Sequence, residues 1–142
     1  MHLRTAVVSD LASIEALLHA SGLPTVGVTE HLTHFIVASD AGNVVACGGL
    51  EYHGNFALLR SISVASNARG NGLGKTIVSQ LLTECRARSV PSVVLLTTTA
   101  ADYFASLGFA TVARQDVPAP LLTSSQFQSV CPDSATAMLM NL

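Results

Sequence analysis

Charged residues and long apolar runs are scarce in this sequence, and each shortage excludes a class of protein. Only 11% of the 142 residues are charged and the formal net charge is −2, so the chain lacks the basic field that holds DNA or RNA. No apolar stretch approaches the length needed to cross a bilayer. The opening residues MHLRTAVVSD also lack the apolar run of a secretory signal. We therefore expect neither a nucleic-acid partner nor a membrane partner.

Cysteine is scarce as well, with single residues at positions 47, 85 and 131. Their number is odd and they lie far apart, so they match neither a zinc spacing nor a disulfide framework. We expect reduced thiols that pack as small hydrophobic side chains. Reduced thiols in turn favour a cytoplasmic location.

The chain has the length of one domain and 49% of its residues are hydrophobic, which predicts a single domain over residues 1–142. Apolar periodicity predicts the order β-α-β-β-β-α-β-α-β-β, hence a mixed, mostly antiparallel sheet flanked by helices, of the α/β (α+β) class. We expect strands at 3–8, 35–40, 44–52, 56–64, 92–98, 109–114 and 134–142, and helices at 9–21, 72–90 and 99–109.

Two details of this prediction concern element ends and edges. Ser9 and Thr99 are the expected N-caps of the first and last helices. The segment 134–142, SATAMLMNL, is apolar enough that, as an edge strand, it would favour a homodimer contact.

The loop ARGNGLGKT, residues 68–76, is the most informative stretch. An ATP-binding P-loop requires glycine where Arg69 stands, and the strand SVVLLTT ends in hydroxyls instead of an acidic residue. A dinucleotide fingerprint requires glycine where Lys75 or Ile77 stands. What remains is a glycine-rich loop entering a helix near Gly72, whose first amides have no internal partner. The loop therefore predicts a pyrophosphate cradle, with added charge from Arg69 and Lys75.

The run 69–74, RGNGLG, resembles the R/Q-x-x-G-x-G/A signature of the GNAT acyltransferases. The segment LLTTTAADYFASLGF is similar to the acetyltransferase domain of N-acetylglutamate synthases, and LLRSISV and the tail SSQFQSVCPDSATAM resemble the small acetyltransferases found with arsenic-resistance genes. The resemblance spans the whole chain. It implies acetyl-CoA as co-substrate and direct attack by the amine of a small amino acid or of an arsenic- or phosphinothricin-type analogue.

The resemblance also implies how the co-substrate is held. The pantetheine arm would pair with the fourth strand, whose splay from the fifth makes room for the thioester. One fourth-strand amide would stabilise the oxyanion. The residues implied in co-substrate binding are Ile62, Ser63, Val64, Arg69, Gly70, Asn71, Gly72, Leu73, Gly74 and Lys75.

Glu51, at the end of the third strand, is our candidate for the base that deprotonates the acceptor amine, directly or through water. Arg60 lies in an apolar run, where an unpaired charge is costly. It either pairs with a carboxylate such as Glu51 or clamps an anionic group of the acceptor. Alternation places Arg60 on the same face of its strand as residues 58, 62 and 64. Thr97 ends the fifth strand near the expected thioester, as a candidate acceptor contact.

The group that protonates the departing thiolate is less directly indicated. Many relatives carry a tyrosine where this chain has Phe104, while Tyr103 lies one position earlier, about 100° round a helix. Tyr103, water or the cofactor itself remain as proton donors. His31 and His34 have helical spacing but no evident third ligand, which argues against a metal site.

Two other functions stay open. The departure at Phe104 is compatible with a catalytically silent acyl-CoA-binding module, and the family also contains enzymes that acetylate proteins or peptides. The loops 22–34 and 118–133 are long enough to cover the site, which favours a small acceptor.

Overall fold

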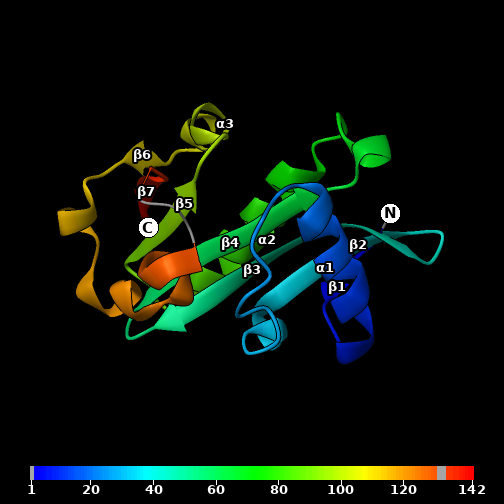
Figure 1. Cartoon of the computed structure of the whole chain (residues 1–142), viewed down its shortest axis with the longest axis horizontal. Helices are drawn as coiled ribbons and strands as arrows, with labels where there is room; N and C mark the ends of the chain where they lie inside the picture. The colour runs from blue at the N-terminus through cyan, green and yellow to red at the C-terminus, as the bar shows by residue number, and fades with distance from the viewer. Residues whose placement is uncertain (1, 131–133) are drawn as a thin grey trace. The chain divides into compact units, whose positions relative to one another are not determined.

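The computed structural model of the chain describes residues 2–130 and 134–142. Cys131 and the centre of the tail motif, for which the sequence made predictions, lie outside the described residues. Along the chain, the strands and α-helices follow the expected order β-α-β-β-β-α-β-α-β-β (Figure 1). The segment 115–134, expected to be mostly loop, contains short turns at Arg114–Asp116, Ala119–Thr123 and Gln126–Val130.

The strands form a mixed sheet with the hydrogen-bonded order β1-β2-β3-β4-β5-β7-β6. The β4–β5 pair is parallel, and the pairs β1–β2, β2–β3, β5–β7 and β6–β7 are antiparallel. This confirms the predicted α/β class with a mostly antiparallel sheet. The chain divides into two compact units, residues 1–50 with 60–83 and residues 51–59 with 84–142.

Unit 1 carries the N-terminal strands and the beginning of the second helix. It comprises β1 (His2–Thr5), α1 (Leu11–Ala20), β2 (Phe35–Asp40), most of β3 (Asn43–His53), the second half of β4 (Phe56–Val64) and the first part of α2 (Leu73–Ala87). The apolar stripe of α1 packs with the inner faces of the strands, and the buried cluster includes Ile14, Leu18, Phe35, Val37 and Cys47. Burial of Cys47 agrees with its expected packing role.

Gly48 holds the start of α2 close to β3. A Cβ at this position would lie 2.6 Å from both Ile62 Cδ1 and Ile77 Cγ2, a distance that real Cβ atoms do not tolerate. Glycine is therefore required for the close approach of helix and sheet. This contact fixes the helix that follows the glycine-rich loop.

Unit 2 carries the C-terminal strands. It comprises the end of β3, the first half of β4, the end of α2, β5 (Ser92–Thr97), α3 (Ala101–Ser106), β6 (Ala110–Thr111) and β7 (Thr136–Asn141). Its buried cluster includes Leu58, Val94, Val117, Leu121 and Ala137. The strand β5 is buried along most of its length, as its continuous apolar run predicts.

The prediction that the last strand lies at an edge is wrong. β7 is paired on one side with β5 from Ser92↔Asn141 to Thr97↔Thr136, and on the other side with the short β6. Its apolar residues serve an interior strand of unit 2. The argument for a homodimer contact through this strand is therefore lost.

Both expected N-caps are also wrong. Ser9 lies inside a 3₁₀ turn, Val8–Asp10, and α1 begins after Asp10 without a side-chain cap bond. The Asp10 carboxylate accepts instead from Val7 N and from Arg4, at 2.8 Å and 2.6 Å. At α3 the N-cap is Ala100 rather than Thr99.

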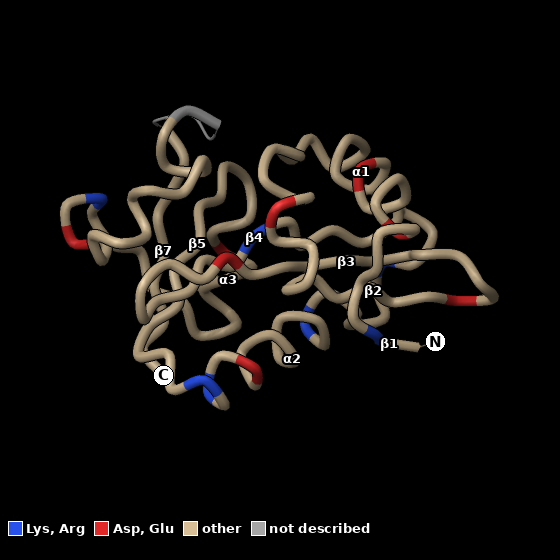
Figure 2. The backbone as a smooth tube through the Cα atoms, turned by 90° about the horizontal axis from the view of Figure 1, so that it is seen from below, with Lys and Arg blue, Asp and Glu red and all other residues tan. Residues whose placement is uncertain are grey.

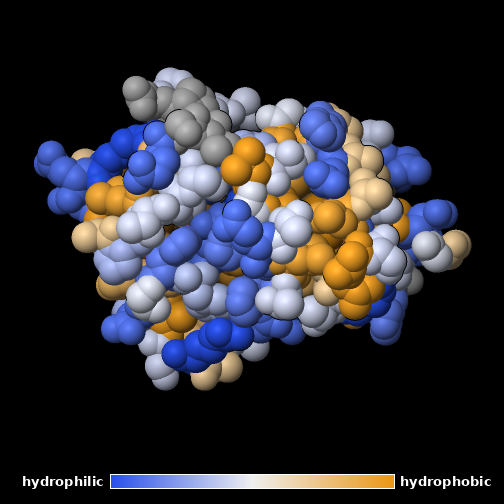
Figure 3. Space-filling model, turned by 60° about the horizontal axis from the view of Figure 1, so that its bottom comes forward, coloured by the Kyte–Doolittle hydropathy of each residue, from blue (hydrophilic) through white to orange (hydrophobic). Residues whose placement is uncertain are grey.

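The surface carries few charges, and they are scattered along the backbone (Figure 2). Figure 3 shows hydrophobic residues gathered right of centre on the face in view, with hydrophilic residues around them. Among the described residues, no helix combines the length and the apolar character that a membrane crossing requires.

Candidate active site

The glycine-rich loop of unit 1 has the backbone that its sequence predicts. Gly70 and Gly72 have φ values of 86° and 73°, in the left-handed region that side chains rarely tolerate. A Cβ built on either glycine would meet no atom within 4 Å. The two glycines are therefore required by backbone conformation, and the space beside them is open to a ligand.

The loop leads directly into α2, which begins at Leu73. The first internal bond of the helix runs from Thr76 N to Gly72 O, at 3.0 Å. The amides of residues 73–75 precede that bond and are the ones a helix leaves for an outside acceptor. Arg69 is exposed and donates from Nε to Val64 O at 3.1 Å, a bond in which its two Nη groups take no part. Lys75 is exposed on the first turn.

The strand before the loop is interrupted at Ser61, whose φ is 63°. The expected alternation, with residues 58, 60, 62 and 64 on one face, fails for this reason. Leu58 and Arg60 are buried, but the next buried residue is Ser63, and Ile62 is half-buried. A left-handed residue inside a strand adds a kink that period-two reasoning does not foresee.

Side chains around this kink are bonded within unit 1. The Cys47 thiol donates to Ser61 O at 3.3 Å, and burial raises the pKa of that thiol to about 12. Ser63 Oγ contacts Leu17 O at 3.1 Å and Ser21 Oγ at 2.6 Å. Ser63 is thus tied to α1 by its side chain, and what it can offer a ligand is its main chain.

Arg60 is buried, with 4% of its surface exposed. Its Nε donates to Ser61 Oγ at 2.9 Å and its Nη2 to Pro24 O at 3.3 Å. These two acceptors orient the guanidinium within unit 1.

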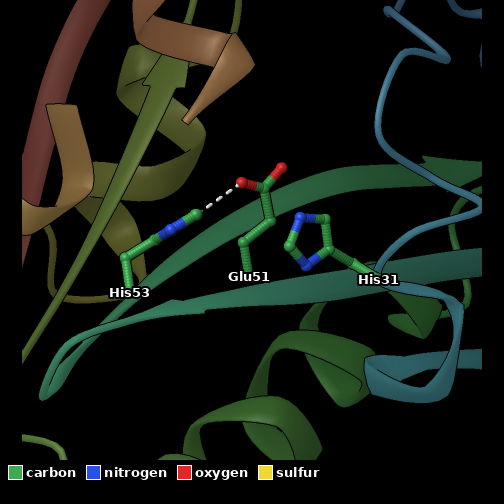
Figure 4. Close-up of side chains that lie close together, drawn as sticks. All are labelled: His31, Glu51 and His53. Atoms are coloured by element: carbon green, nitrogen blue, oxygen red, sulfur yellow. Dashed lines mark hydrogen bonds and ion pairs between the residues drawn. The ribbon is translucent and has the colours of Figure 1, made fainter. Parts of the chain in front are cut away.

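Glu51 is the buried carboxylate of unit 2, with 1% of its surface exposed. Its Oε1 accepts from Ser124 Oγ at 2.7 Å and lies 2.8 Å from His53 Nε2 (Figure 4). Gln126 N donates to Ser124 Oγ at 3.2 Å, which holds the serine in place. Sequence reasoning missed both partners. Alternation along β3 could have indicated His53, two residues on, but Ser124 is 73 residues away and gave no signal.

Thr97 is the last residue of β5, and Tyr103 lies in α3, which follows it. The Thr97 hydroxyl oxygen accepts from Ala100 N at 3.0 Å, and so supports the turn into α3. Tyr103 is 41% exposed, and burial of the remainder raises the pKa of its phenol. Phe104 is buried and meets Phe109 edge to face. Phe104 is therefore part of the core, while Tyr103 faces outward.

The parallel pairing of β4 with β5 is short. It joins Ala57 to Val93 and Leu58 to Val94, although both strands continue past this point. β5 remains paired with β7 as far as Thr97. Within unit 2, the parallel ladder therefore joins the first half of β4 to the first half of β5. The splay of the fourth and fifth strands beyond this pair stays a prediction.

The candidate residues fall into two sets. Unit 1 contains Arg60, Ile62, Ser63, Val64, Arg69, Gly70, Asn71, Gly72, Leu73, Gly74 and Lys75; unit 2 contains Glu51, Thr97 and Tyr103. Within unit 1 the chain brings the kinked strand end and the glycine loop together, through the bond from Arg69 to Val64.

Comparison with known proteins gives a consistent assignment. Residues 31–111, more than half of the chain, match the family model of the acetyltransferase (GNAT) domain. The fold is similar to that of a Mycobacterium tuberculosis protein in complex with CoA, with 24% identity, TM-score 0.82, and 100% and 99% of the two chains covered.

Two further structures share the fold. The N-acetylglutamate synthase of Neisseria gonorrhoeae, complexed with coenzyme A and N-acetyl-glutamate, matches with 19% identity and a TM-score of 0.85 over 99% of this chain, which spans 35% of the synthase. A GNAT-family acetyltransferase of Staphylococcus aureus matches with 18% identity and a TM-score of 0.78, and 99% and 98% of the two chains are covered. The chain belongs to the GNAT family and is an acetyl-CoA-dependent N-acetyltransferase.

Proposed function

We propose that this protein, acting as a single domain over residues 1–142, transfers acetyl from acetyl-CoA to the amine of a small amino acid or amino-acid analogue. The observation that carries the proposal is the open loop at Gly70 and Gly72, which combines left-handed glycines with the start of a 15-residue helix. The solved relatives complexed with CoA, including the aminoglycoside 6'-N-acetyltransferase, support the choice of co-substrate.

In this proposal the amides of residues 70–75 bind the diphosphate of CoA, where the helix dipole favours negative charge. Arg69 and Lys75 add positive charge beside it. The main chain of residues 62–64 pairs with the pantetheine arm, because the kink at Ser61 turns that part of β4 out of regular alternation. The cradle accounts for recognition of CoA but leaves the acceptor open.

The acceptor is assigned from Arg60 and from the relatives. A buried guanidinium suits a bidentate contact with a carboxylate, as an amino acid would supply. The Neisseria relative was crystallised with N-acetyl-glutamate, which supports an amino acid as acceptor. We extend the proposal to arsenic- and phosphinothricin-type analogues, and so to a resistance role in the cytoplasm. Thr97 is proposed as a further contact to this acceptor.

The chemistry follows from the proposed binding. The acceptor ammonium loses a proton under the influence of Glu51, directly or through an intermediary, and the free amine attacks the thioester carbonyl. A β4 amide stabilises the oxyanion, a contribution of about 3 kcal/mol in enzymes of this kind. Collapse of the intermediate breaks the C–S bond, and the thiolate takes a proton from the phenol of Tyr103.

Release of free CoA tests this proposal. The purified protein is incubated with acetyl-CoA and, separately, with L-glutamate, phosphinothricin, an arsenic-containing amino acid and a mixture of peptides. CoA release with a free amino acid supports the proposal. Release with peptides alone would make the protein a peptide acetyltransferase, and acetyl-CoA binding without release would make it a silent binding module.

A further inference from the structure

The side chains bonded to Glu51 form a relay that the family assignment does not describe. Ser124 and His53 both contact the same carboxylate oxygen, Oε1, at 2.7 and 2.8 Å. An ionised carboxylate only accepts hydrogen bonds, so the proton between Glu51 and His53 lies on Nε2 of the ring. The second ring nitrogen, Nδ1, is then the one that can change its protonation.

The position of Nδ1 suits a nitrogen that gains a proton. It lies 3.5 Å from Thr123 Oγ1, whose own proton is donated to Pro120 O at 2.8 Å. The threonine oxygen therefore presents a lone pair toward the ring. A protonated Nδ1 would gain an acceptor there, while Glu51 would compensate the positive charge of the imidazolium.

The side chains of Glu51 and His53 differ in their exposure to solvent. The Glu51 side chain is 1% exposed and the His53 side chain 19%. A carboxylate so deeply buried and already bonded by a serine is poorly placed to exchange protons with an incoming amine. The imidazole, in contrast, is partly exposed and reachable. The difference in exposure favours the histidine for proton exchange and the glutamate for orientation.

The relay also stands at the right place along the strands of unit 2. Counting back from the two-residue turn Gly54–Asn55 puts Glu51 opposite Leu58 on β4. Leu58 forms the last pair of the β4–β5 ladder, with Val94. The carboxylate is therefore level with the Leu58–Val94 pair of unit 2.

We propose that His53 is the proton acceptor for the amine and that Glu51, fixed by Ser124, is its positioning residue. This inference rests on the proposed function. His53 Nδ1 takes one proton from the acceptor ammonium, and the neutral amine forms the C–N bond as the carbonyl π electrons move to oxygen. When the C–S bond breaks, the acceptor nitrogen loses a second proton. The departing thiolate takes that proton, directly or through Tyr103. His53 then releases its proton to solvent, so each turnover yields the acetylated amine, CoA and one proton.

The test uses His53→Gln, whose amide can still donate to Glu51 but cannot take a proton. With the best amino acid of the CoA-release screen, we expect kcat/KM at pH 7 to fall by about 100-fold or more, with an unchanged KM for acetyl-CoA. Without a proton acceptor at position 53, the variant can use only acceptor molecules whose amine is already deprotonated in solution. Its kcat/KM should therefore rise about tenfold per pH unit and approach the wild-type value near the pKa of the amine.

Ser124→Ala tests the positioning part, with Ser92→Ala as its matched control. Both serines are buried in unit 2, and Ser92 bonds Asn141 rather than Glu51. Similar losses of stability are expected, with reduced kcat in Ser124→Ala alone. Equal kcat in the two variants would overturn the positioning role.

If the wild type turns over and His53→Gln has the same kcat/KM at pH 7, the inference is overturned but the proposed function is not. Wild-type binding of acetyl-CoA without turnover would overturn both. Should His53→Gln fail to fold, ¹⁵N NMR of the wild-type ring decides. The neutral ring must carry its proton on Nε2, and a proton on Nδ1 would contradict the relay.

Discussion

Substitution of Gly72 by alanine tests the cradle most sharply, because the structure separates the cost to the fold from the cost to the ligand. Its φ of 73° penalises any side chain, by about 1–2 kcal/mol. No atom lies within 4 Å of the new Cβ, so no steric clash inside the protein adds to that penalty. The methyl group instead occupies the space in which the diphosphate is proposed to lie.

The loss of affinity can be estimated from the amides concerned. A hydrogen bond to a charged group contributes about 1.5–3 kcal/mol, so displacing the diphosphate from one amide should weaken CoA binding about 10- to 100-fold. Calorimetric titration with CoA measures this effect. Thermal unfolding measured in parallel gives the change in stability.

Gly42→Ala is the matched control. Gly42, in the turn between β2 and β3, has φ 83° and equally open surroundings, so its backbone penalty should be similar. We expect equal stability losses and a weaker affinity for CoA in Gly72→Ala alone. Equal affinities in the two variants would refute the assignment of the diphosphate to this loop.

Three further predictions concern buried groups. Arg60→Lys should raise KM for the amino-acid acceptor at least tenfold and leave KM for acetyl-CoA unchanged; steady-state kinetics that show the reverse would contradict the clamp. Burial raises the pKa of Cys47 to about 12 and that of Cys85 to about 11. Neither thiol should therefore be alkylated in the native protein at pH 8, which peptide mapping would check. The stability of the fold should also fall as pH rises above the ordinary thiol pKa of 9.0. The hydrogen bond from Arg4 lowers the pKa of Asp10, so its contribution is present above the ordinary value of 3.8 and is lost as pH falls below it; acid titration of Asp10→Asn should show a smaller decline in stability than the wild type.

Local patterns in the sequence predicted the elements well. The apolar stripe after Gly72 predicted α2, and the largely apolar run from Phe56 predicted β4, because both signals depend on neighbours three or four residues apart at most. The glycine loop was likewise readable, since a left-handed φ requires glycine at that position. These features are those that position the proposed cradle.

Features that depend on distant partners were not readable. A strand was expected at 109–114, but its pairing with β7 was not, so the edge position assigned to β7 was wrong. The kink at Ser61 has no glycine or proline to announce it. The bond from Ser124 to Glu51 joins residues far apart in the chain. Side-chain networks of this kind arise from tertiary packing, which sequence periodicity does not encode.

A comparison of acetyl-CoA with S-acetylpantetheine, which lacks the diphosphate, measures the central claim most directly. Calorimetric titration of the wild-type protein should give saturable binding of acetyl-CoA and binding of the shorter thioester at least tenfold weaker, a difference that Gly72→Ala should reduce. Equal affinity for the two thioesters, or no affinity for acetyl-CoA, would contradict the account.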